Sequence, residues 1–473
     1  MKKIFFTLLS IILLSSCNED FLDIPREDAE QAENFFQNQD DAVQSVNAIY
    51  SNLRFWRLAG FGPLILSIAG DDAEKGSSPG DAAFFNDINN FNYTPSAFII
   101  NDYWTGQFYG INLCNQAITN IPGITMDESL KTRLIAEARF LRANHYFNLV
   151  RTFGGVPIFD GLPADRNYNI PRNTKEEVYD FILADLQFAK DNLPANYGAT
   201  DIGRATLGAA NGFIAKVNMY LGNWSQALAA SNDVIGGGYS LLPNFNSVFR
   251  IENENSVESI FEIQASFIPG NCDVSNSQYS QVQGVRGQYG WGFNVPTLAL
   301  SNSFEAGDLR RDATIIYRGE TTPEGDFIAL IGDNPMYNQK SYVPSGQIGT
   351  CSEGSEQNIR VLRFAEILLI NAEAANELGD TAQALLSVNK VRVRAGLPEL
   401  SGLSQEQLRT AIWKERQSEL AMEGDRFLDL VRQGNAASVL GPLGFTAGRN
   451  ELFPIPSESI SLSNGVLEQN PGY

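Results

Sequence analysis

The chain has 473 residues and a formal net charge of −21. A chain of this length exceeds the usual size of one hydrophobic core, so we expect two subdomains or one large helical array. The acidic balance argues against nucleic acids and phosphate-rich ligands, which need a basic patch, and the single histidine, His145, excludes a multi-histidine metal site and disfavours a Ser-His-Asp triad.

The N-terminus predicts a lipoprotein leader. Two lysines precede an apolar run, residues 4–14, which is too short to span a bilayer as a permanent helix. The run leads into Leu-Ser-Ser-Cys, ending at Cys17, which resembles a lipobox. We therefore expect a signal peptide over residues 1–16, acylation of Cys17, and a lipidated tether over residues 17–39. An ordinary secretory leader with an incidental cysteine is the alternative.

Helical periodicity follows the tether. Residues 42–53 form a first amphipathic pattern, and the helical pattern returns at residues 103–120, 128–151 and 175–192. In between, residues 60–101 mix Gly, Pro, Ser and Asp with aromatic residues. A long irregular segment in a compact protein is more often functional than idle.

An internal repeat marks two helix pairs. Residues 221–228 (LGNWSQAL) match residues 378–385 (LGDTAQAL), and each copy follows an Ala-rich helix and opens another. The pattern resembles a tetratricopeptide helix pair, although the copies are too far apart for a simple solenoid. Residues 236–360 alternate turn residues with short apolar runs, which predicts loops and short strands; the runs are residues 260–263, 314–317 and 327–331.

Three further cysteines are present besides Cys17. Cys114 lies in a helical pattern, where a small buried side chain is the ordinary interpretation. Cys272 and Cys351 lie in loop-like sequence, so a disulfide between them is possible but not required.

The C-terminal part predicts three helices. The first covers residues 364–378 and stops at Gly379, the second covers residues 381–394, and the third runs from Ser404 to about Arg432. The third helix is unusual because charged residues stand where a core helix would carry Leu; they are Glu415, Arg416, Glu419, Glu423 and Arg426.

This charged pattern, ER-x-x-EL-x-x-EG-x-R-x-x-DL-x-R-x-G over residues 415–434, resembles the signature of the SusD/RagB family of outer-membrane nutrient-binding lipoproteins. The segment GWGFNVP at residues 290–296 and the chain end at residues 452–473 are also similar to that family. The resemblance implies a mostly α fold, in which tetratricopeptide-like helical pairs form a scaffold with long loop-rich insertions and a few short strands. Residues 40–250 and residues 251–473 would then form one compact unit.

The resemblance also implies a function. A member would be anchored by lipid to the outer membrane, facing the cell surface, where it captures an oligosaccharide and delivers it to a SusC-type TonB-dependent transporter. An oligopeptide ligand is the alternative within the family, and a surface glycoside hydrolase or an assembly scaffold are alternatives from other classes. No cofactor, metal or nucleic acid is expected. Because the family shares the charged motif while its ligands differ, buried ion pairs are favoured over an ion-binding or ligand-binding cluster.

Candidate ligand residues come from the irregular segments. Aromatic rings stack on the apolar faces of pyranose rings, and amide and acid groups suit the sugar hydroxyls. We therefore expect residues 60–101 and 267–342 to meet on one face, with the ligand bound by Asp72, Phe84, Phe85, Asn86, Tyr279, Tyr289 and Trp291. Phe84 and Phe85 could instead fill a core, and Trp291 could be structural. No catalytic residue is expected, although Asp71 and Asp72 would be the paired acids of the hydrolase alternative.

Overall fold

The computed structural model describes residues 35–163, 169–268, 277–348 and 354–473. The predicted acylation site, Cys17, and the possible disulfide between Cys272 and Cys351 lie outside the described residues. Cys114 is buried in helix α7 (Phe98–Asn120), as predicted.

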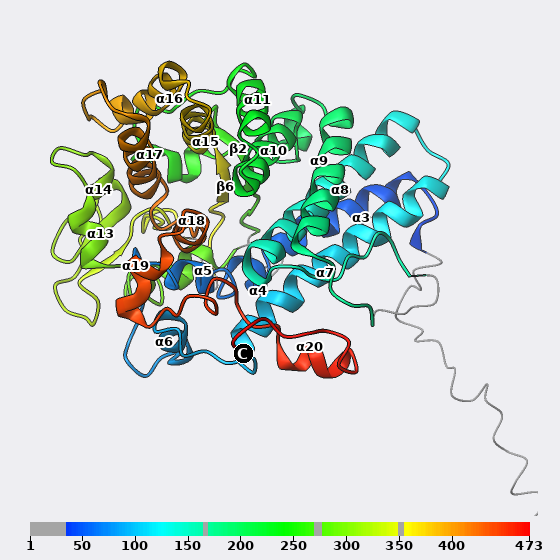
Figure 1. Cartoon of the computed structure of the whole chain (residues 1–473), viewed down its shortest axis with the longest axis horizontal. Helices are drawn as coiled ribbons and strands as arrows, with labels where there is room; N and C mark the ends of the chain where they lie inside the picture. The colour runs from blue at the N-terminus through cyan, green and yellow to red at the C-terminus, as the bar shows by residue number, and fades with distance from the viewer. Residues whose placement is uncertain (1–34, 164–168, 269–276, 349–353) are drawn as a thin grey trace, which may run out of the picture.

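The protein is mostly helical (Figure 1). Long helices occupy the right and upper parts of the view, and shorter elements gather below and to the left. The long helices are α3 (Gln39–Leu53), α7, α8 (Glu128–Phe153), α9 (Lys175–Asn192), α10 (Leu207–Leu221), α11 (Trp224–Ile235), α15 (Phe364–Glu377), α16 (Thr381–Arg394) and α17 (Gln405–Leu420). The short helices are α4 (Trp56–Ala59), α5 (Leu64–Ile68), α6 (Phe84–Asn89), α12 (Tyr279–Gln283), α13 (Leu298–Ser303), α14 (Arg310–Thr314), α18 (Arg426–Arg432), α19 (Ala436–Leu440) and α20 (Ser457–Leu462). Single 3₁₀ turns are η2 (Ile121–Gly123), η3 (Ala199–Asp201), η4 (Asn246–Phe249), η5 (Ile251–Asn253) and η6 (Gly441–Leu443).

The two copies of the sequence repeat form the helix pairs α10–α11 and α15–α16. Gly222 (φ +70°) and Gly379 (φ +81°) take the left-handed conformation between the helices of each pair, which glycine adopts at little cost. Helix α11 packs against α15, so two copies that are distant in sequence lie side by side in the fold. Small alanine side chains on α15 are fully buried and let the helices approach closely.

Capping residues explain why two predicted helices have the expected ends. Thr174 accepts a hydrogen bond from the backbone of Glu177 at the start of α9 (3.2 Å), and Asp380 accepts one from Gln383 at the start of α16 (3.0 Å). Each bond satisfies a backbone N–H that has no partner within the helix.

In the described part of the chain, six short strands form three antiparallel two-stranded sheets, β1–β3, β2–β6 and β4–β5. They are β1 (Ala73–Gly76), β2 (Ser259–Ile263), β3 (Phe293–Pro296), β4 (Ile315–Tyr317), β5 (Met336–Asn338) and β6 (Ile359–Arg363). Two of the three predicted apolar runs became strands β2 and β4. The third run, residues 327–331, forms no strand, and only Phe327 makes an isolated bridge, with Thr321.

The third predicted C-terminal helix is wrong in one respect, because it is divided in two. Helix α17 ends at Leu420, and α18 begins only at Arg426. Lys340 and Arg363 donate side-chain hydrogen bonds to the carbonyl of Glu419 (2.9 and 3.2 Å), which would accept from the backbone of Glu423 if the helix continued. Met422 (φ +66°) and Gly424 (φ +93°) then turn the chain away.

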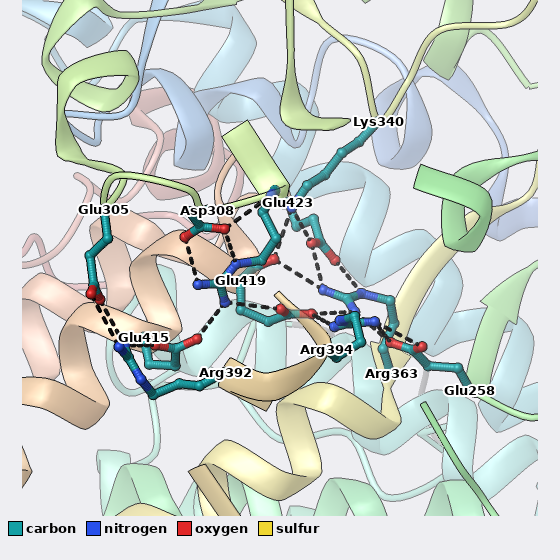
Figure 2. A network of polar contacts seen from close by, with 11 residues as sticks. Glu258, Glu305, Asp308, Lys340, Arg363, Arg392, Arg394, Glu415, Glu419 and Glu423 are labelled. Atoms are coloured by element: carbon teal, nitrogen blue, oxygen red, sulfur yellow. Dashed lines mark hydrogen bonds and ion pairs between the residues drawn. The ribbon is translucent and has the colours of Figure 1, made fainter. Parts of the chain in front are cut away.

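The charged side chains of α17 lie inside the protein, in the network that Figure 2 shows. Glu415 pairs with Arg310 (2.6 Å) and Arg392 (2.9 Å). Glu419 is fully buried and pairs with Arg363 (2.9 Å) and Arg394 (2.5 Å). Burial alone would raise the pKa of Glu419, but the charges of Arg394, Arg363 and Arg310 hold it below its ordinary value.

The remaining charges of the motif are paired as well. Glu423 accepts from Arg363 and Lys340 (both 2.8 Å), Arg416 pairs with Asp429 (3.0 Å), and Arg426 pairs with Asp71 (2.6 Å). These contacts confirm the prediction that the motif forms ion pairs across the fold. Their partners come from distant segments, so the network ties α17 and α18 to the rest of the chain.

Candidate ligand-binding surface

The two irregular segments meet, as the sequence predicted. Strand β1 of the first segment pairs with strand β3 of the second, and Glu74 lies opposite Val295 in the register. Ser77 extends the contact by donating its backbone N–H to the carbonyl of Gly292 (2.5 Å). Gly76 is required here, because a Cβ at this position would lie 2.4 Å from the same carbonyl. The close approach of the two backbones therefore depends on this glycine.

One arginine joins the loops that follow these strands. Arg286 donates hydrogen bonds to Ser77 Oγ (2.5 Å), Asp81 Oδ2 (2.9 Å) and Ser78 Oγ (3.2 Å) in the first segment. It also donates to the backbone carbonyl of Trp291 in the second (3.0 Å). The guanidinium group therefore fixes the position of the Trp291 backbone relative to the 77–81 loop.

Exposed aromatic side chains gather beside this junction. Trp56 is 41% exposed and Trp291 is 37% exposed, and the ring of Phe61 lies between them, 5.7 Å from the first and 5.8 Å from the second between centroids. Phe84 and Phe98, which is 49% exposed, make a further ring contact at 4.5 Å. We call this set the aromatic surface; its members are Trp56, Phe61, Phe84, Phe98 and Trp291.

The aromatic surface rests on buried rings. Phe85 and Phe293 are both buried, and their centroids lie 5.4 and 5.2 Å from that of Phe61. Phe85 also contacts Phe84 at 4.7 Å, which connects the two groups of exposed rings. Edge-to-face packing of this kind fixes ring orientation, so the exposed rings have a rigid support.

A pocket of about 270 Å³ opens next to Trp291. Tyr289 and Trp291 line it together with two amide side chains, Gln281 and Gln288. Within the described residues, Gln281 Oε1 has no hydrogen-bond donor. The pocket therefore combines aromatic side chains with amide side chains, the groups that suit the ring and the hydroxyls of a sugar, although Gln281 Oε1 itself is buried.

The structure brings some of the predicted ligand residues together and separates others. Trp291 and Tyr289 share the pocket, Phe84 belongs to the aromatic surface, and Asn86 is partly exposed on α6. Tyr279 instead lines a separate, partly open pocket of about 190 Å³, with Lys340 and other charged residues.

Two predicted residues require correction. Phe85 is fully buried beneath Phe61, so its ring is not presented to a ligand. Asp72 is also buried, accepting a hydrogen bond from Gln417 (2.8 Å), and burial raises its pKa to about 6 although the charge of Arg426 opposes the shift. Both residues support the loops of the site from inside the protein.

The residues that sequence reasoning missed are Trp56, Phe61, Phe98 and Arg286. Trp56 directly follows the first helix, and Phe61 follows Gly60, the point where helical periodicity stops. An aromatic residue at such a break was a usable signal. The sequence around Arg286 gives no such signal, because the role of this side chain depends on four partners in two segments.

The described residues show no other chemical centre. Across residues 35–163, 169–268, 277–348 and 354–473 no group of three or more His, Cys, Asp or Glu side chains could hold a metal ion. His145 is buried, its Nδ1 lies 2.7 Å from Gln107 Oε1, and burial lowers its pKa to about 4. In the same part of the chain, every helix is too short or too polar to cross a membrane.

Comparison with known families adds independent findings. Residues 257–473 match the SusD family, and residues 20–221 match a family described as starch-binding and associating with the outer membrane. Residues 1–18 match a prokaryotic membrane lipoprotein lipid attachment site. The matches to both halves of the chain confirm the family that the sequence motifs suggested.

Individual relatives support the same family assignment. The SusD-like protein P2 of Formosa agariphila is 30% identical over 481 residues, which cover 93% of this chain and 94% of that protein. The solved structure of a laminarin-binding SusD-like protein has a TM-score of 0.82 and 31% identity, and covers 92% of this chain and 100% of that one. Surface glycan-binding protein A from Bacteroides fluxus has a TM-score of 0.80 and 27% identity, with coverage of 92% and 100%.

Proposed function

The chain belongs to the SusD family of outer-membrane lipoproteins, and from this premise we propose that it captures an oligosaccharide at the aromatic surface and passes it to a SusC-type TonB-dependent transporter. The observation that carries the proposal is the row of rings Trp56, Phe61 and Trp291, in which the two tryptophans are exposed and Phe61 is partly buried between them. Each ring offers a flat apolar face to the C–H groups of a pyranose, and the amides of the adjacent pocket can bond its hydroxyls.

The number of exposed rings favours a chain of sugars over one sugar. Trp56, Trp291 and Phe98 are 41%, 37% and 49% exposed. More than one ring is therefore accessible to a ligand. A ligand that spans them gains from each contact, so we expect affinity to rise with oligosaccharide length. The relative of 31% identity is described as laminarin-binding, which makes laminarin oligosaccharides the first probes.

We further propose binding without turnover. The acids of the hydrolase alternative, Asp71 and Asp72, are bonded to other side chains of the protein. Asp71 pairs with Arg426, and Asp72 is buried and accepts a hydrogen bond from Gln417. A retaining or inverting glycosidase needs two carboxyl groups that flank the scissile bond. This placement therefore gives the hydrolase alternative no support.

Isothermal titration calorimetry of the protein without its leader tests the proposal. Laminarin oligosaccharides of increasing length, starch oligosaccharides and an oligopeptide panel are titrated into wild type and Trp291→Ala. We expect saccharide binding that strengthens with length and weakens in the variant. Peptide binding in place of saccharide binding, or new reducing ends from a repurified sample, would overturn the proposal.

Transfer to a transporter needs its own experiment. The lipid attachment site places the chain on the outer membrane, and orientation toward the cell surface is part of the proposal. Cys17→Ala is expected to release the protein from membranes. In intact cells, wild type should be accessible to added protease and should co-purify from mild detergent with a TonB-dependent barrel. Protection from protease in intact cells would contradict the surface orientation.

A further inference from the structure

In the described residues around Trp291, the basic side chains are bonded within the protein. The segments that carry the site, residues 55–61, 73–89 and 286–293, contain three basic side chains, Arg57, Lys75 and Arg286. Arg286 has the best position to meet a ligand, since it bonds the backbone of Trp291 and is about one-third exposed. Its terminal nitrogens, however, are occupied by Asp81, Ser77 and Ser78.

The Arg286–Asp81 ion pair is the centre of this arrangement. Asp81 Oδ2 lies 2.9 Å from Arg286 Nη1 and also accepts a hydrogen bond from Ser77 Oγ (2.8 Å). A guanidinium and the carboxylate that it binds form a pair with no net charge, so the pair attracts a second carboxylate less than a free guanidinium would. Asp81 is 41% exposed on its side chain, so an approaching anion would meet its negative charge as well.

Of the other two basic groups, Lys75 is bonded internally and Arg57 is only loosely paired. The ammonium group of Lys75 is buried and donates to the carbonyls of Ser78 (2.8 Å) and Asp81 (2.9 Å). Arg57, the residue after Trp56, is 49% exposed on its side chain, and its Nε is 3.6 Å from Asp102 Oδ1. Two exposed acids, Glu74 and Asp87, stand on the same segment as Asp81. A ligand carboxylate or sulfate placed at Trp291 would therefore lose hydration at an apolar surface without gaining an unpaired cation there.

We infer that the site, at Trp291, favours uncharged glycans over uronate-containing or sulfated ones, and that Asp81 determines this selectivity by neutralising Arg286. The inference rests on the proposed function and specifies its ligand class. It assigns to Asp81 a role in specificity that differs from stacking. A site with the same aromatic rings and an unpaired Arg286 would hold a cation beside Trp291, where a uronate carboxylate could accept two hydrogen bonds from it.

Calorimetry with two probes tests the inference directly on wild type. A laminarin hexasaccharide serves as the neutral probe, and an oligogalacturonate of the same length serves as the anionic probe. We expect the laminarin hexasaccharide to bind and the oligogalacturonate to bind at least about a hundredfold more weakly. Equal affinities would overturn the inference while leaving the proposed function intact. If the folded protein binds neither probe nor any other saccharide, the proposed function itself fails.

Asp81→Asn then tests the cause of the selectivity. The substitution keeps the size of the side chain and an acceptor for Ser77, and it removes the charge that neutralises Arg286. The ratio of anionic to neutral affinity should rise about tenfold, and the gain should fall as salt increases. Asp87→Asn is the matched control, since it removes an exposed acid from the same segment that Arg286 does not contact; its ratio should change by less than about threefold.

A double variant tests whether the charge of Arg286 causes the gain in affinity for the anionic probe. Arg286→Gln in the Asp81→Asn background removes the freed cation, so the gain for the anionic probe should disappear. Thermal unfolding of each variant checks that the loop remains folded. If Asp87→Asn raises the ratio as much as Asp81→Asn does, net charge and not the ion pair controls selectivity, and the inference is wrong. The measurement on wild type decides the selectivity even if a variant fails to fold.

Discussion

Two regions of this protein depart from the usual distribution of side chains in opposite directions. Around α17, carboxylates and guanidinium groups are buried, and around Trp291, large aromatic rings stand in water. Each of these buried carboxylates has several partners at hydrogen-bond distance, whereas Trp56 and Trp291 contact Phe61 at tilted and T-shaped angles and remain 41% and 37% exposed. Burying charge is costly unless it is paired, and exposing apolar area has no folding benefit.

The difference indicates which region serves the fold and which serves the ligand. Removal of one member of the buried network leaves its partners charged and unpaired, so the folded state becomes less stable. Removal of an exposed ring changes the folded state little, because water already covers much of that ring. The loss then appears only when a ligand would have covered it. Measuring stability and affinity on the same variants therefore tests the comparison.

The largest expected effect is in the buried network. Glu419→Ala leaves Arg363 and Arg394 without a shared carboxylate in a site from which water is excluded. We expect a loss of about 3–5 kcal/mol in the free energy of unfolding, measured by chemical denaturation. Glu406→Ala, at an exposed position in the first turn of the same helix, is the control and should change stability by less than about 0.5 kcal/mol. Similar results for both would mean that the network adds little.

Neighbouring phenylalanines provide a sharper contrast. Phe85 is fully buried and Phe84 is only partly buried, although both lie in the first turn of α6. Phe85→Ala should lower the free energy of unfolding by about 3–5 kcal/mol through the cavity that it leaves. Phe84→Ala should cost clearly less stability and should weaken oligosaccharide binding. Equal losses of stability with unchanged affinity would place Phe84 in the core and outside the binding surface.

Trp291→Ala probes the aromatic surface itself. We expect the free energy of binding to fall by about 2 kcal/mol, roughly thirtyfold in affinity, since stacking at a central aromatic contact is lost. The thermal midpoint should change little. Tyr109→Ala, which removes an exposed ring elsewhere on α7, should leave the affinity unchanged. An undiminished affinity in Trp291→Ala would move the ligand to another face.

Arg426→Ala should produce a smaller loss of stability than Glu419→Ala. Its ion pair with Asp71 is partly exposed, at 16% and 22% of the two side chains, so solvent screens part of the interaction. We expect a loss of about 2 kcal/mol and a thermal midpoint several degrees lower, with ligand affinity retained by the folded fraction. Loss of affinity at unchanged stability would instead assign Arg426 to the ligand site.

The smallest expected effect is a pH dependence from Asp72. Its pKa is about 6 in the folded protein, above the ordinary value near 3.8, because the side chain is buried. The folded state therefore binds more protons than the unfolded state between about pH 4 and pH 6, and stability decreases as pH rises through that window. The change in the free energy of unfolding across this range, measured by chemical denaturation, should differ by about 1–2 kcal/mol between wild type and Asp72→Asn. Parallel curves would contradict this assignment.

The sequence alone determined the parts of this protein that depend on local chemistry. Capping residues set the ends of α9 and α16, and glycine at positions 222 and 379 set the turns of the repeat, because each acts within a few residues of itself. The charged motif at residues 415–434 and the leader were sufficient for the family. Even the meeting of the two irregular segments could be predicted, since both interrupt the helical scaffold and carry the aromatic residues.

Tertiary structure alone decided which side chains face the ligand. Phe84 and Phe85 are identical neighbours, and only the rings of Phe61 and Phe293 above and beside them bury one and leave the other accessible. The break after Leu420 likewise depends on Lys340 and Arg363, which are 79 and 56 residues away from the carbonyl that they bond. Exposure and charge pairing are set by neighbours that are distant in sequence, so no local pattern could reveal them, and the role of Arg286 beside Trp291 became visible only when both loops were placed.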